Sequence, residues 1–181
     1  MLSDSLVDVF ASGSWAFLPA APARGLATEL EAEILDEQFS WCENPHLGEG
    51  AGLLILTAAM NGWMLLHGAS ETVGWAAGLL SEQRDVYRAT IDVRLPAMSW
   101  AFLERGVPTR SVSVELGDDG DLVARTSGHP LPFEADGIDL PDTGTGLDPF
   151  FYPVALLAEH GVTLHDLEVA LDRPSVTLRV R

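Results

Sequence analysis

The fold is decided by residues 53–68, LLILTAAMNGWMLLHG, in which two apolar runs flank Asn61 and Gly62. An Asn-Gly pair between apolar runs indicates a tight β-hairpin, because both turn positions need a positive φ angle. Further along, residues 86–95, VYRATIDVRL, alternate between apolar and polar side chains. This period of two is typical of a strand with one buried face.

More short strands follow without long helices between them. We expect strands at MSWAFLE (98–104), SVSVEL (111–116) and LVART (122–126), the last two joined by a Gly/Asp turn at 117–121. The segment SVTLRV (175–180) predicts a final strand. Consecutive strands indicate an antiparallel meander and exclude a doubly wound parallel sheet.

Helical spacing appears in the segments between and after the strands. Apolar residues at helical spacing predict an amphipathic helix over residues 23–39, and Ser70 is the expected N-cap of a second helix. Near the end of the chain, Gly161 is expected to close one short helix. Thr163 and Asp166 form an approximate capping box for another. The sequence therefore predicts a single α+β domain over residues 1–181, with an antiparallel sheet of hairpin plus meander packed against a few helices.

Charge limits the kinds of partner that the protein can have. The 181 residues include 27 acidic residues and 10 basic ones, and the formal net charge is −17. Such a surface repels nucleic acid and anionic lipid, so we expect neither as a partner. The acidic N-terminal segment lacks the basic region of a signal peptide, and a single cysteine, Cys42, excludes an intrachain disulfide. We expect a cytoplasmic protein.

One long segment carries a resemblance to known sequences. Residues 62–106, GWMLLHGASETVGWAAGLLSEQRDVYRATIDVRLPAMSWAFLERG, together with PLPFE (130–134) and LLAEHGVTLHDLE (156–168), resemble a group of uncharacterised actinobacterial proteins of unknown function. The resemblance supports the fold and implies no mechanism. No catalytic residue is carried over from it.

Known catalytic and metal-binding motifs are not found in the sequence. The five histidines and Cys42 do not follow a zinc spacing, and the Asp/Gly turns do not follow an EF-hand order. Ser70 lacks the glycine of a nucleophile elbow, and the chain contains no lysine for Schiff-base chemistry. We therefore expect no metal and no cofactor, and the catalytic residues of any enzymatic activity are unknown.

Two hypotheses remain open from the sequence. The first is a non-enzymatic acidic protein, immunity-like or regulatory, that binds a basic protein partner through Trp15, Arg88 and Arg94. In this hypothesis Trp15, which lies among small residues, is expected to be exposed.

The second hypothesis is a small-molecule-binding protein, or a motif-less cyclase-like enzyme of secondary metabolism, with an apolar pocket between the sheet and the helices. The aromatic residues Trp63, Tyr87, Trp100 and Phe102 would line this pocket, and His67 would act as an acid or base. A hollow pocket lined by these residues would favour the second hypothesis, whereas a packed core with an exposed aromatic patch would favour the first.

Overall fold

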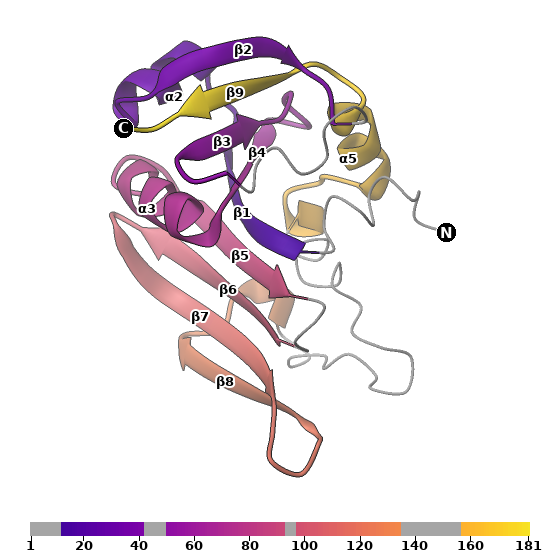
Figure 1. Ribbon diagram of the computed structural model, residues 1–181. Coiled ribbons are helices and arrows are strands. Elements are labelled where there is room, and N and C mark those ends of the chain that lie inside the picture. The colour runs from indigo at the N-terminus through magenta and orange to yellow at the C-terminus, as the bar shows by residue number, and fades with distance from the viewer. Residues whose placement is uncertain (1–11, 42–49, 93–96, 135–156) are drawn as a thin grey trace.

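The computed structural model describes residues 12–41, 50–92, 97–134 and 157–181 (Figure 1). Within these residues, nine strands form one sheet in the order β2-β9-β3-β4-β1-β5-β6-β7-β8, and every pairing is antiparallel. The expected α+β class is confirmed. The strands are β1 (Ser12–Pro19), β2 (Glu33–Phe39), β3 (Leu53–Leu56), β4 (Trp63–Gly68), β5 (Val86–Asp92), β6 (Ala97–Glu104), β7 (Val107–Leu116), β8 (Leu122–Gly128) and β9 (Ser175–Arg179).

The expected hairpin joins β3 to β4. Asn61 and Gly62 have φ angles of 48° and 80°, and Met60 bridges to Trp63 across the turn. These positive angles match the twist that antiparallel strands require of a two-residue turn. The meander is confirmed as well, because β5, β6, β7 and β8 are neighbours in chain order.

The central strand β1 was not expected from the sequence. It lies between β4 and β5, with Trp15 opposite His67 on one side and Ala89 on the other. Trp15 is 0% exposed, so the prediction that it is an exposed partner contact is wrong. A strand that is buried on both faces has no alternation of polar and apolar residues, and small residues at 11–14 concealed it further.

The prediction of a helix over residues 23–39 is correct only for its first part. Helix α2 covers only Ala23–Glu29, and residues Glu33–Phe39 form β2, which pairs with β9. Glu31 ends the helix with a φ of 49°, and the amide of Ala32 donates to the carbonyl of Ala27 at 2.8 Å. This is the hydrogen-bond pattern of a Schellman motif, here without its usual glycine.

Two further helices are close to expectation. Helix α3 spans Ser70–Leu80, but its N-cap is Ala69, so the predicted capping role of Ser70 is wrong. Helix α5 spans Leu164–Leu171, and the capping box of Thr163 and Asp166 is confirmed. A short 3-10 helix covers Pro132–Glu134. No helix among the described residues is long and apolar enough to cross a membrane.

The helices divide between the two faces of the sheet. In Figure 1, α2 and α3 lie on one side and α5 lies on the other. Leu26 of α2 and Val73 of α3 belong to one buried apolar cluster, and Leu167 of α5 belongs to the other. The sheet is therefore the middle layer, and its strands are buried on both faces where helices cover them.

Candidate functional site

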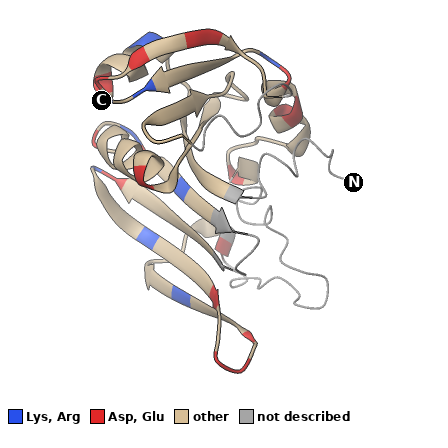
Figure 2. Cartoon of the chain, in the orientation of Figure 1, with Lys and Arg blue, Asp and Glu red and all other residues tan. Residues whose placement is uncertain are grey.

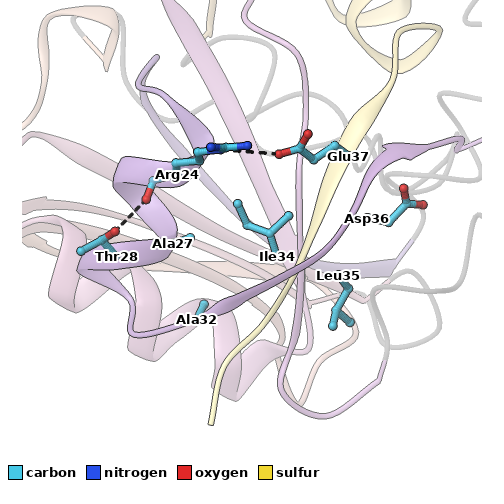
Figure 3. Close-up of a pocket in the computed structure, with 8 residues that line it drawn as sticks. All are labelled: Arg24, Ala27, Thr28, Ala32, Ile34, Leu35, Asp36 and Glu37. Atoms are coloured by element: carbon cyan, nitrogen blue, oxygen red, sulfur yellow. Dashed lines mark hydrogen bonds and ion pairs between the residues drawn. The ribbon is translucent and has the colours of Figure 1, made fainter.

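The candidate site is a groove at the β2 end of the sheet (Figure 3). Helix α2 runs toward this end, the chain reverses at Glu31, and β2 returns beside the helix, so the groove has a helix as one wall and an edge strand as the other. Its volume is about 640 Å³. It is lined by Arg24, Ala27, Thr28, Ala32, Ile34, Leu35, Asp36 and Glu37.

The groove combines an apolar floor with a charged rim. Figure 3 shows Ile34 pointing toward α2 while Leu35 projects from the other side of the strand. Ala27 is buried, Ile34 is half-buried, and Leu35 is 38% exposed. At the rim, the guanidinium of Arg24 lies 3.9 Å from the carboxylate of Glu37. Both of these side chains are largely exposed, so the pair contributes little and can reopen easily.

The strand that forms the groove is an edge strand. Among the described residues β2 pairs only with β9, and the register shifts twice along that pairing, between Ile34 and Asp36 and between Asp36 and Phe39. The outer edge of β2 is therefore not hydrogen-bonded to another strand in this part of the chain. An edge of this kind is a place where an extended segment of another chain can pair.

Exposed acidic residues lie along β2 and the turn before it, with arginines on α2 and β9 beside them (Figure 2). Four of the seven residues from 31 to 37 are acidic, and all four are exposed. Arg24 is the one basic residue among those that line the groove. Acidic residues also occur at the turn between β7 and β8 and on α5 (Figure 2).

Helix α2 is held in place by an ion pair. The Nη2 atom of Arg84, after α3, donates to both carboxylate oxygens of Glu29 at 2.5 and 2.7 Å. The two side chains are 16% and 28% exposed, so solvent screens this pair less than the pair of Arg24 and Glu37. The groove wall is therefore tied to α3.

A second, smaller hollow lies between α3 and the end of β9. It has a volume of about 270 Å³ and is lined by Glu71, Thr72, Trp75, Val180 and Arg181. Trp75 is 48% exposed, whereas Trp15, Trp41 and Trp100 are buried. An exposed tryptophan is thus present at position 75 and not at position 15. Helical spacing placed it off the buried stripe of α3 and was the signal for this exposure.

Three of the predicted ligand-binding residues lie together, on the other face of the sheet. The rings of Tyr87 and Phe102 stack at 4.7 Å, and Trp63 lies 6.0 Å from Tyr87. His160, which was not among the predicted lining residues, stacks on Trp63 at 3.9 Å and lies with its Nε2 atom 3.1 Å from the Tyr87 hydroxyl. The four rings pack against each other.

Burial keeps the polar members of this cluster neutral. Burial, together with the charges of Asp85, Glu159 and Glu104, raises the pKa of Tyr87 to about 12. Burial also lowers the pKa of His160 below its ordinary value, against the opposing effect of the nearby acids Glu159 and Asp85. The pair is therefore a neutral hydrogen-bonded contact near pH 7.

The other two predicted lining residues are core residues. His67 is 3% exposed, stacks on Trp15 at 4.2 Å, and lies 5.5 Å from Trp41. Its Nδ1 atom is 3.1 Å from the carbonyl oxygen of Ser14. Trp100 is 2% exposed in the same cluster. Neither the 640 Å³ groove nor the 270 Å³ hollow includes any of the five predicted lining residues.

The structure describes one of the two arginines proposed for partner binding. Arg88 is half-buried on the face covered by α3, and a Cβ atom at Gly74 would come within 2.9 Å of its Nη1 atom. The missing side chain of Gly74 therefore leaves room for the guanidinium. Arg94 lies outside the described residues. Among the described residues, no group of three or more His, Cys, Asp or Glu side chains is placed to hold a metal ion.

The groove is not predicted from the sequence, because residues 33–39, which form β2, are expected to be the second half of a helix. A signal was present, since Glu29, Glu33 and Glu37 are spaced four residues apart. In a helix these like charges would lie side by side and destabilise it. Searches of protein-family models, of curated proteins and of solved structures found no match to this chain.

Proposed function

We propose that the protein is a non-enzymatic acidic binding protein, immunity-like or regulatory, that engages a basic protein partner. The observation that carries the proposal is the groove between α2 and β2, which joins an apolar floor to a rim of exposed carboxylates. Opposite charge speeds the encounter of two proteins, and apolar contacts at the centre of an interface hold the complex. The net charge of −17 favours a basic partner over an acidic one.

The packing of the aromatic residues supports this proposal over the small-molecule alternative. Tyr87 is covered by Phe102, Trp63 by His160, and His67 by Trp15, so within the described residues these rings fill the space that a ligand would need. Trp75, exposed beside Glu71 on α3, adds an aromatic side chain of the kind enriched at protein interfaces.

Binding to defined basic and acidic peptides tests the proposal. Arg- and Val-containing peptides, with matched Glu- and Val-containing peptides as controls, are titrated by fluorescence anisotropy at about 20 mM and 300 mM NaCl. We expect only the basic peptides to bind, with an affinity that falls about tenfold or more at the higher salt concentration. Absence of binding at low salt, or binding that salt leaves unchanged, would refute the proposed function.

A further inference from the structure

We infer that the partner docks as an extended basic segment that adds a tenth strand to the outer edge of β2, with the groove receiving its side chains. This inference rests on the proposed function and specifies its site and binding mode. It begins from the position of β2, which among the described residues has β9 on one side and no strand on the other.

The geometry of the groove suits a strand. An extended peptide presents successive side chains to opposite faces of the sheet. On the α2 side, alternate side chains of the added strand would meet Ala27 and Ile34, where an apolar residue is favoured. Glu33, Asp36 and Glu37 are exposed along the strand, and the Glu37 carboxylate lies on the α2 side, 3.9 Å from Arg24, so arginine or lysine is favoured at the positions beside these carboxylates.

Charge decides which occupant the edge accepts. A second copy of this chain would bring its own Glu33, Asp36 and Glu37 against the same residues, and like charges on neighbouring strands destabilise pairing. Charged edge strands protect proteins from pairing with themselves in this way. A basic segment reverses the sign of the interaction, so the same residues that exclude self-pairing attract it.

Backbone methylation of the peptide provides a direct test of strand addition. A seven-residue peptide of alternating valine and arginine, as long as β2, is prepared in two versions. Each carries N-methyl groups on one alternate set of amides, so that one version loses the amides that face β2 and the other loses those that face away. Side chains and charge are identical in both. Because only one set donates to β2, we expect one version to bind about tenfold more weakly and the other to stay within about twofold of the unmethylated peptide.

Two charge-reversed variants locate the site. Asp36→Lys with Glu37→Lys changes the groove, and Asp118→Lys with Asp119→Lys makes the same change in charge at the exposed turn between β7 and β8. We expect the groove variant to lose about tenfold or more in affinity for the basic peptide and the turn variant to lose less than about threefold. Circular dichroism of both variants checks that the sheet is retained.

The outcomes separate the inference from the proposed function. If methylation of either set of amides weakens binding equally, or if both charge variants lose affinity equally, the peptide is attracted diffusely to an acidic surface. That result would overturn strand addition but would remain consistent with a basic partner. Sedimentation showing a dimer that the groove variant alone abolishes would make a second copy the occupant, which also overturns the inference. Failure of every basic peptide to bind would remove the proposed function itself.

Discussion

Arg110 and Glu134 form a buried ion pair, and their exposed fractions are 5% and 6%. The Nε atom of Arg110 donates to the carboxylate at 3.0 Å, and its Nη1 atom donates to the carbonyl oxygen of Ser127 at 3.0 Å. The amide of Leu131 donates to the same carboxylate at 2.7 Å. These bonds fasten the segment after β8 to the sheet. The attraction and hydrogen bonds between the two groups compensate the desolvation of both charges only while both partners are present.

We predict that Arg110→Ala destabilises the protein by about 3–5 kcal/mol, because it leaves the carboxylate of Glu134 buried without its cation. The double variant Arg110→Met with Glu134→Leu should recover most of this loss, since no charge then remains buried. Urea denaturation of the three proteins measures the free energies of unfolding. A double variant as unstable as the single one would contradict this account of the pair.

His160 makes stability depend on pH. Its pKa is lowered in the folded protein, chiefly by burial, so between the folded pKa and the ordinary value of about 6.5 the unfolded chain binds more protons than the folded one. The free energy of unfolding therefore rises with pH through this window. The stability that the neutral imidazole contributes is present above about pH 6.5 and is lost as the pH falls toward the folded pKa.

The expected result is a smaller loss of stability between about pH 7.5 and pH 5 in His160→Gln than in the unsubstituted protein. Glutamine does not titrate, and its amide can still bond to the Tyr87 hydroxyl. His129→Gln, at an exposed position, serves as the matched control. Urea midpoints measured across the range give the comparison, and parallel profiles for all three proteins would exclude His160 as the source.

The start of helix α5 is an example of a structural feature that the sequence predicts correctly. Thr163 accepts a hydrogen bond from the amide of Asp166 at 3.2 Å, and Asp166 accepts one from the amide of Thr163 at 2.8 Å. The hydrogen bonds from Thr163 also lower the pKa of Asp166. Capping is local in sequence, so the box was predictable from residues three apart.

Loss of this cap should cost about 1 kcal/mol, since Thr163→Ala removes the acceptor for an otherwise unpaired helix amide. Thr163→Ser keeps the hydroxyl and should stay within about 0.5 kcal/mol of the unsubstituted protein. Thermal unfolding followed by circular dichroism measures both. If serine and alanine are equally destabilising, the hydroxyl of Thr163 does not carry the effect.

Strands β1 and β2 show where local signals fail. The Asn61-Gly62 turn and the alternation of β5 were enough to predict the hairpin and the strand, because turn residues and one-sided burial are recognisable from neighbouring residues in the sequence. Trp15 is buried by pairing with residues more than 50 positions away, and β2 becomes a strand by pairing with β9. Pairing across such distances overrides local helical spacing, and for β2 the local sign against a helix is the four-residue spacing of Glu29, Glu33 and Glu37.

The surplus of carboxylates acts at the scale of the whole molecule. A net charge of −17 opposes the compact state by self-repulsion, and dissolved salt screens that repulsion over a Debye length of about 10 Å at 0.1 M. Composition alone therefore predicted the sign of the net charge at the surface. It did not predict the groove, because the position of β2 depends on the last described strand of the sheet.

We predict that the thermal midpoint rises as NaCl increases from about 10 to 200 mM, because screening relieves repulsion among carboxylates. The variant with Asp36→Lys and Glu37→Lys has four fewer units of negative charge and should gain less from salt. Calorimetry at several salt concentrations provides the midpoints. A midpoint that falls with salt would mean that attractive ion pairs outweigh the repulsion.

The position of β9 has a consequence for synthesis. Residues 175–179 lie between β2 and β3 in the sheet, so before they leave the ribosome β2 has no strand to join it to the remaining seven. Contacts between chain segments so far apart form late and slowly. A nascent chain that has not yet released residues 175–179 therefore lacks the strand that joins β2, and with it one wall of the groove, to the rest of the sheet.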